Sequence, residues 1–370
     1  MSVTKSQHAV GVSIELLRKE FGEKVALDDV SLDIEPGTFL VLLGPSGSGK
    51  TTMLRCLAGI ERPTNGRIRI GDQLVVDSKV FVQPEKRGLA MVFQDYALWP
   101  HLSVAKNVGF PLHNSQLDKS GRASLVGDLL ERVGIAALAD RFPNQLSGGE
   151  QQRVALARAL AADVGLILFD EPLSNLDADR REQLRIEIAT LTRESGSTAV
   201  YITHDQSEAF ALADKVGVLN QGRLVQLDTP EAIYRHPKNA FVARFTGIAG
   251  EFPVTALRDS GPHHLEVALP FAPDEVIQAV AFDRPSPGAD TSLFVRAAGV
   301  SLHEPSNPDG VRGEIRDVAF NGRGYEHVVS VGLDVVLTKI FSPRRFDRES
   351  NVKVCFDPSS CFVMDPMRGS

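Results

Sequence analysis

The stretch "TFLVLLGPSGSGKTTMLRCLAGI" (38–60) joins an apolar run, a glycine-rich loop and a helical pattern. Residues 44–51 fit the spacing G-x-x-x-x-G-K-[ST], directly after a run that is typical of a buried strand. Met53, Leu54 and Leu57 then follow at helical spacing. The sequence therefore predicts a phosphate-binding loop between the end of a strand and the start of a helix.

This loop combines backbone and side-chain groups that suit a polyphosphate. Its glycines let the chain fold tightly, so that backbone N–H groups and the helix N-terminus face the phosphate oxygens. Lys50 adds a full positive charge, and Thr51 offers a hydroxyl to magnesium. We assign the whole loop to nucleotide binding: Gly44, Pro45, Ser46, Gly47, Ser48, Gly49, Lys50, Thr51 and Thr52.

The composition limits the class of protein. A chain of 370 residues favours two domains over one, and a formal charge of −7 argues against a broad basic surface for nucleic acid. Cys56, Cys355 and Cys361 show no CxxC spacing, which indicates free thiols in a reducing compartment. No apolar run reaches membrane-spanning length, and the first residues do not form a secretory signal. We expect a cytosolic location and no nucleic-acid partner.

Alternating apolar runs and amphipathic stretches predict an α/β fold in the first part of the chain. The runs at 164–169 and 198–203 are expected to be buried parallel strands, and residues 86–160 a helical insertion. A hairpin is expected near 220–222. Short alternating segments after it predict a β-barrel, so we expect a larger α/β domain at 1–240 and a β-barrel domain at 241–370.

Two carboxylates follow the predicted strand at 164–169. At the carboxyl edge of a parallel sheet, Asp170 would face the ligand crevice and hold Mg²⁺, while Glu171 would orient the attacking water as a general base. Two acids after a strand more often form a solvated turn. The phosphate loop upstream favours the catalytic interpretation.

The segment "LSGGEQQRVALARAL" (146–160) discriminates best among nucleotide hydrolases. Ser147 can cap the following helix, and Glu150, three residues on, can complete a capping box. Gly148 and Gly149 leave backbone N–H groups open to an anion. We favour ligand contact for Ser147 and the two glycines, and a capping role alone for Glu150.

Together these motifs resemble the ATPase subunits of ABC transporters, over nearly all of the first 240 residues. The resemblance implies the ABC-type phosphate-loop NTPase fold, followed by an all-β OB-like (TOBE) regulatory domain. It also implies ATP and Mg²⁺ as cofactors. In this family the phosphate loop of one copy and "LSGGE" of a second clamp the same ATP, which implies a head-to-tail homodimer. Glu150 stands where the family often has glutamine, a variation that we expect to preserve fold and activity.

The resemblance also assigns roles to four further residues. Gln94 would sense magnesium and the attacking water, and Asp177 would link the two sites across the dimer. His204 would contact the γ-phosphate, although a histidine before a helix is more often a surface or capping residue. Phe21 would stack on adenine, although by itself it would more often be a core residue. Asp205 with Glu208 looks instead like a helix start without a catalytic role.

Two segments bear on coupling to other subunits. The irregular, apolar segment at 95–112 resembles the surface that docks a helix of the membrane subunit; for Trp99, ordinary packing is an equal alternative. Residues 233–250 resemble the passage into the C-terminal domain of importers for sugars, polyamines, sulfate, ferric iron and phosphonates. The segment "LFVRAAGV" lacks the proline and acid of that subgroup's arginine-proline-acid turn, which puts a regulatory role of this turn in doubt.

Three functional classes can be compared on these features. A phosphate-loop kinase or GTPase has no use for "LSGGE". A soluble ABC ATPase of translation or repair would usually show two ATPase halves, long coiled coils, zinc fingers or a basic surface, and this sequence shows none of these. We therefore expect an importer ATPase, peripheral on the cytoplasmic face of the membrane, that works with two permease subunits and a separate solute-binding protein. The expected solute is ferric iron or a polyamine, with phosphonate, sulfate or sugar as alternatives.

Overall fold

The computed structural model describes residues 9–365 except 175, 262, 283–284 and 333–334. The chain forms two compact units, Met1–Pro230 and Glu231–Ser370. The predicted domain boundary near 240 lies later in the sequence, at the start of helix α8 (Ala240–Phe245). The short helices α7 and α8 therefore group with the second unit.

A six-stranded sheet forms the centre of the first unit, in the order β10-β9-β3-β8-β7-β6. Only the β9–β10 hairpin is antiparallel among these pairs. Every residue of β3, β7 and β8 is buried, as the continuous apolar runs predict for strands covered on both faces. The strands are β3 (Phe39–Leu43), β6 (Leu89–Val92), β7 (Leu166–Asp170), β8 (Thr198–Thr203), β9 (Lys215–Asn220) and β10 (Arg223–Asp228).

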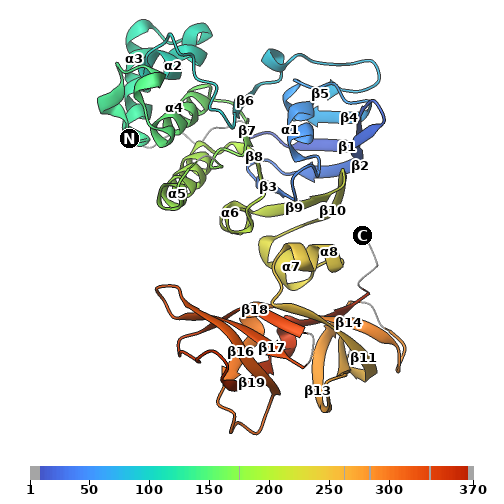
Figure 1. The fold of residues 1–370 in the computed structure, drawn as a ribbon. Coiled ribbons are helices and arrows are strands. Elements are labelled where there is room, and N and C mark those ends of the chain that lie inside the picture. The colour runs from blue at the N-terminus through green and yellow to red at the C-terminus, as the bar shows by residue number, and fades with distance from the viewer. Residues whose placement is uncertain (1–8, 175, 262, 283–284, 333–334, 366–370) are drawn as a thin grey trace. The chain divides into compact units, whose positions relative to one another are not determined.

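A smaller antiparallel sheet, in the order β2-β1-β4-β5, makes up the rest of the strand structure of this unit. Its strands are β1 (Val12–Phe21), β2 (Lys24–Ile34), β4 (Asn65–Ile70) and β5 (Gln73–Val76). Helix α1 (Lys50–Ala58; Figure 1) shares one apolar core with both sheets, as their buried side chains form a single cluster. The helix that follows the phosphate loop is thereby fixed between two sheets.

The helices of the predicted insertion follow β6, which itself lies within the predicted range of 86–160. Four residues, Leu89–Val92, make this edge strand, too few to stand out from a helical pattern. The insertion contains α2 (Val104–Gly109), α3 (Lys119–Arg132) and α4 (Gly148–Ala161), with short 3₁₀ turns at Phe110–Asn114, Ala136–Leu138 and Pro143–Gln145. Helices α5 (Ala178–Ser195) and α6 (Gln206–Leu212) and a 3₁₀ turn at Pro84–Lys86 complete the unit.

The second unit contains a closed barrel and a separate five-stranded sheet. The barrel has the order β11-β12-β13-β20-β14, with β11 (Gly250–Gly261), β12 (His264–Leu269), β13 (Ala272–Ala281), β14 (Asp290–Val295) and β20 (Cys361–Met364). The sheet has the order β15-β19-β16-β17-β18, with β15 (Val300–His303), β16 (Val311–Phe320), β17 (Tyr325–Val331), β18 (Val335–Ser342) and β19 (Asn351–Phe356). Strands β16 and β17, two of the short alternating segments on which the barrel prediction was based, lie in this sheet rather than in the closed barrel.

Helices α7 (Pro230–Arg235) and α8 are tied to the barrel by Arg296. This side chain is 1% exposed and donates hydrogen bonds to the carbonyls of Tyr234, Ala243 and Gly247. Burial lowers the pKa of the Arg296 guanidinium to about 10. The arginine of "LFVRAAGV" thus caps helix ends, a structural role that needs neither the proline nor the acid of the subgroup's turn.

The three cysteines are free thiols in the structure, as predicted. Within the described part of the chain, we find no helix with both the length and the apolar character needed to cross a bilayer.

Candidate functional site

The phosphate loop lies between Leu43, the last residue of β3, and Lys50, the first residue of α1. The Lys50 side chain is 4% exposed, and its Nζ donates to the carbonyl oxygens of Gly44 at 2.8 Å and Pro45 at 3.0 Å. Burial lowers the pKa of Lys50, while the charge of Glu171 opposes this shift. Two of the three ammonium protons are donated to carbonyls within the loop, so the third can be donated to a phosphate oxygen.

Two glycines of the loop lie where an added Cβ would clash with backbone atoms of other segments. Gly49 has φ +104°, and a Cβ there would lie 2.5 Å from the carbonyl oxygen of Ala26. A Cβ on Gly44 would lie 2.3 Å from the carbonyl oxygen of Leu219. The loop is therefore packed against backbone from two other segments, and its shape depends on glycine.

Asp170 and Glu171 lie at the carboxyl edge of the central sheet, as the sequence predicts. Asp170 is 5% exposed; burial raises the pKa of its carboxyl group, and the nearby charge of Arg55 opposes the rise. Glu171 adopts the left-handed conformation (φ 43°), and its Oε2 lies 3.3 Å from Nδ1 of His204. The structure thus brings together two residues that are far apart in sequence and that were both assigned to catalysis.

A buried acid, Glu208, holds the turn that carries His204, in addition to lying in the first turn of the predicted helix. Asp205 caps α6 by accepting from the N–H groups of Ser207 and Glu208, as predicted. The Glu208 carboxylate does not complete a capping box; it is 5% exposed and accepts from the hydroxyls of Tyr201 at 2.9 Å and Thr203 at 2.8 Å. Glu208 therefore fixes the end of β8 just before His204.

The segment 147–150 opens helix α4. Ser147 and Gly148 are exposed, while Gly149 is buried. The Glu150 carboxylate accepts from the Ser147 N–H at 2.7 Å and from the Ser147 hydroxyl at 2.8 Å, and these bonds lower the pKa of Glu150. Glu150 thus makes the capping contact with Ser147 that the sequence predicts, and Ser147 lies at the protein surface.

Gln94 is exposed and lies two residues after β6. The segment that follows is bound to α4 by Arg158, which donates to the carbonyls of Tyr96 and Ala97 at 2.9 and 2.7 Å. The Arg158 guanidinium also lies 4.8 Å from the Trp99 ring centroid. Arg158 was not among the residues predicted from the sequence; a charged residue within the apolar run "VALARAL" was the signal that could have identified it.

Phe21 and Asp177 each have local partners. The Phe21 ring is 47% exposed, and Nζ of Lys19 lies 4.5 Å from its centroid. Asp177 caps α5 by accepting from the Arg180 N–H at 3.0 Å. The contacts described above join Lys50 to the loop and Glu171 to His204, whereas Phe21, Ser147 and Asp177 contact residues of their own segments.

The donor set suits a magnesium–nucleotide complex better than an all-protein metal site. Among the described residues, no group of three or more His, Cys, Asp or Glu side chains could hold a metal. Mg²⁺ is usually held by one or two protein oxygens together with substrate phosphates. Buried Asp170 and the half-buried Thr51 on the first turn of α1 fit that need.

The chain is similar in sequence to known ATP-binding proteins. The family model described as ABC transporter matches residues 27–174. The spermidine/putrescine import ATP-binding protein PotA of Chromobacterium violaceum is 43% identical over 338 residues, which covers 90% of this chain and 91% of that protein. The sulfate/thiosulfate import ATP-binding protein CysA 2 of the same organism is 44% identical over 313 residues, with coverage of 84% and 81%.

A solved structure extends the comparison to three dimensions. The dimeric, post-hydrolysis state of the ATP-binding cassette MJ0796 bound to ADP and Pi matches with a TM-score of 0.53 and 33% identity, covering 59% of this chain and 98% of that one. The combination of fold, site and relatives leads to one assignment. The chain belongs to the ABC transporter family, as an ATPase subunit of the importer type.

Proposed function

We propose that two copies of this chain close around two magnesium-bound ATP molecules, and that closure and reopening drive solute uptake through separate membrane subunits. The observation that carries this proposal is the 3.3 Å contact between Glu171 and His204 beside the buried Lys50 loop. At the carboxyl edge of the sheet, this carboxylate and this imidazole are proposed to face the terminal phosphate of a nucleotide bound to the loop.

The phosphate loop binds the triphosphate through backbone N–H groups and the Lys50 ammonium. Since Lys50 is already held by two loop carbonyls, little side-chain freedom is lost when it meets a phosphate oxygen. Magnesium, when bound, neutralises charge on the β- and γ-phosphates. Thr51, Asp170 and Gln94 are the residues proposed to hold it, and Phe21 is proposed to stack on the adenine ring.

Hydrolysis requires a water molecule aligned with the γ-phosphate. Glu171 accepts the hydrogen bond of this water and orients it as a general base. His204, held beside Glu171 by the turn that Glu208 fixes, donates to the γ-phosphate and stabilises the charge that develops there.

The second copy supplies the opposite wall of each site. Ser147, Gly148 and Gly149 stand at the N-terminus of α4, where the exposed serine hydroxyl and the backbone N–H groups can reach a γ-phosphate on the partner. Asp177 is proposed to link the two sites across the interface. The dimeric relative bound to ADP and Pi supports this arrangement.

The assembly is proposed to sit at the cytoplasmic face of the membrane, against two permease subunits, with a solute-binding protein on the other side. Trp99 and its neighbours are the proposed permease contacts; the Trp99 ring packs 4.0 Å from the half-exposed Phe110 ring. We propose a polyamine as the first solute to test, since the relative named for spermidine and putrescine aligns over 90% of the chain. Ferric iron and sulfate are the next candidates.

Replacement of Glu171 by Gln tests the core of this proposal. We expect ATP turnover to fall at least about 100-fold while ATP binding persists, and gel filtration with ATP to show a dimer. Glu85→Gln, at an exposed carboxylate of the same unit, is the control and keeps wild-type turnover. Near wild-type turnover by Glu171→Gln would show that another group activates the water, and a monomer with bound ATP would count against the composite site.

A further inference from the structure

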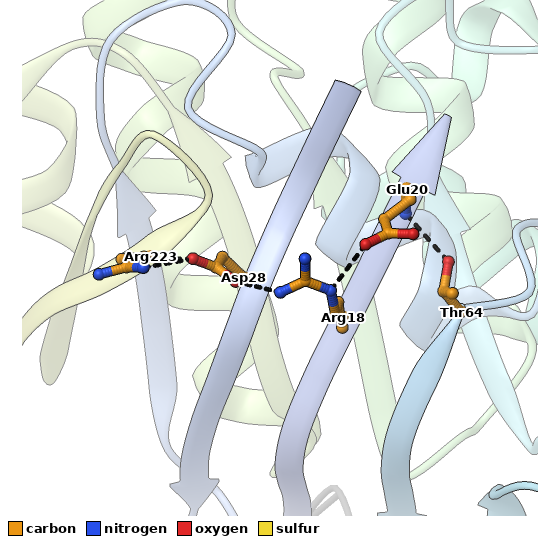
Figure 2. A network of polar contacts seen from close by, with 5 residues as sticks. All are labelled: Arg18, Glu20, Asp28, Thr64 and Arg223. Atoms are coloured by element: carbon orange, nitrogen blue, oxygen red, sulfur yellow. Dashed lines mark hydrogen bonds and ion pairs between the residues drawn. The ribbon is translucent and has the colours of Figure 1, made fainter. Parts of the chain in front are cut away.

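A ladder of ionic contacts connects β10, β2 and β1 in the first unit (Figure 2). Asp28 of β2 accepts a 2.7 Å hydrogen bond from Nε of Arg223 on β10, and its other carboxylate oxygen contacts Arg18 of β1. Arg18 also donates to Glu20 at 2.8 Å. One carboxylate, 19% exposed, thus joins strands of two different sheets.

The backbone next to Asp28 reaches the phosphate loop through the β9–β10 turn. The Asp28 N–H donates to the carbonyl of Gly222 at 2.9 Å, and the Gly222 N–H donates to the carbonyl of Ser48 at 3.0 Å. Gly222 has φ +79°, and a Cβ there would lie 3.0 Å from the carbonyl oxygen of Ala26. The turn therefore fits closely between β2 and the loop that binds phosphate.

The other end of the ladder reaches the segment that carries Phe21. Glu20, the partner of Arg18, donates its N–H to Thr64 Oγ1 at 3.0 Å (Figure 2). Phe21 follows directly and ends β1. The contacts that hold the turn against the phosphate loop are thus continuous with those that hold the proposed adenine-stacking residue.

We propose that Asp28 is a positioning residue, which fixes the spacing between Phe21 and the phosphate loop so that both ends of one ATP are held at once. This inference rests on the proposed nucleotide site. An exposed ion pair contributes little to stability, but a carboxylate shared by two strands restricts their relative movement, and a preorganised site binds more tightly. Hydrogen bonding from Arg223, together with the charge of Arg18, lowers the pKa of Asp28, so the carboxylate is ionised at neutral pH.

The test compares ATP with tripolyphosphate, a competitor that we expect to occupy the phosphate loop and that has no base. For Asp28→Asn we expect KM for ATP to rise about fivefold, kcat to stay within about twofold, and Ki for tripolyphosphate to stay unchanged. The control is Glu15→Gln, which removes the exposed Arg67–Glu15 pair from the same small sheet. This control is expected to leave all three constants at their wild-type values.

Arg223→Gln provides a second variant, because Arg223 is 73% exposed and its replacement leaves the Arg18–Asp28 contact intact. Its KM for ATP should rise less than that of Asp28→Asn, again without a change in Ki for tripolyphosphate. Equal rises in KM for ATP and Ki for tripolyphosphate would show general damage to the loop and overturn the proposal. The proposal would also be overturned if Asp28→Asn and Arg223→Gln had the same constants as Glu15→Gln. If the wild-type chain did not hydrolyse ATP, the proposed function itself would be refuted. If the wild-type chain hydrolysed ATP and Asp28→Asn did so with the same constants, only the role of Asp28 would be refuted.

Discussion

The phosphate loop and the segment 147–150 are both glycine-rich turns at the start of a helix, yet the first is more buried than the second. Lys50 and Ser48 of the loop are 4% and 2% exposed, and backbone from β2 and β9 packs against the loop glycines. Ser147 and Gly148 are exposed, and a Cβ on Gly148 would meet no atom closer than 3.7 Å. The difference suggests that one turn is completed within its own chain, whereas the other is shaped to meet a second molecule.

The largest effect is expected from the buried turn. Lys50→Ala removes the one full charge of the loop, so we expect ATP turnover to fall about 1,000-fold and ATP affinity of the monomer to fall with it. Turnover assays and equilibrium binding of a fluorescent ATP analogue measure the two quantities. Lys86→Ala, at an exposed lysine of the same unit, is the matched control and should change neither.

A substitution in the exposed turn should lower ATP turnover without lowering the ATP affinity of the monomer. Ser147→Arg places a bulky charge where the second copy must approach, so we expect turnover to fall about 100-fold while the monomer binds ATP within about twofold of wild type. Binding is measured at low protein concentration, where the monomer dominates. A loss of monomer affinity as large as that of Lys50→Ala would remove the distinction between the turns.

Replacing one glycine of each turn by alanine compares the two turns by the change in the free energy of unfolding. Gly49→Ala puts a Cβ 2.5 Å from a backbone oxygen at φ +104°, which we expect to cost about 2 kcal/mol or more in the free energy of unfolding. Gly148→Ala meets no such contact and should change that free energy by less than about 0.5 kcal/mol. Denaturant unfolding of both variants measures the difference, and equal losses would contradict the packing described for the loop.

The smallest effect is expected at Glu150. Because bonds from Ser147 lower the pKa of Glu150, its contribution to stability is present above the unfolded-state pKa and is lost as pH falls through the folded-state pKa. Glu150→Gln keeps the hydrogen bonds without the titration, so its stability should fall less than that of wild type in acid, with turnover within about twofold. Thermal unfolding between pH 3 and 7 tests this, and identical acid profiles would show that the Ser147 contact is not held in solution.

The sequence predicted the parts of the fold that depend on local patterns. The phosphate loop, strands β3, β7 and β8 and the β9–β10 hairpin follow from runs of residues that are adjacent in the chain. The split of the second unit into a closed barrel and a separate sheet did not follow, because the barrel closes only when β20 returns to pair with β13 and β14. Such distant pairing leaves no local signal.

Buried charged side chains were the main structural feature that could not be predicted from the sequence. Arg87 is 2% exposed and donates to the carbonyls of Cys56 and Leu57 at the end of α1, and Arg158 and Arg296 play similar parts elsewhere. Charged residues are usually solvated, so composition alone assigns them to the surface. Their partners are carbonyls that become unpaired only where helices and turns end, which the folded structure alone reveals.

The account is tested most directly by a structure of Glu171→Gln with ATP and Mg²⁺. We expect Ser147 Oγ to have left Glu150 and to lie within about 3.2 Å of a γ-phosphate oxygen that Lys50 of the other copy also contacts. If ATP is bound at Lys50 while Ser147 still bonds to Glu150 and faces solvent in every assembly, the shared site is wrong.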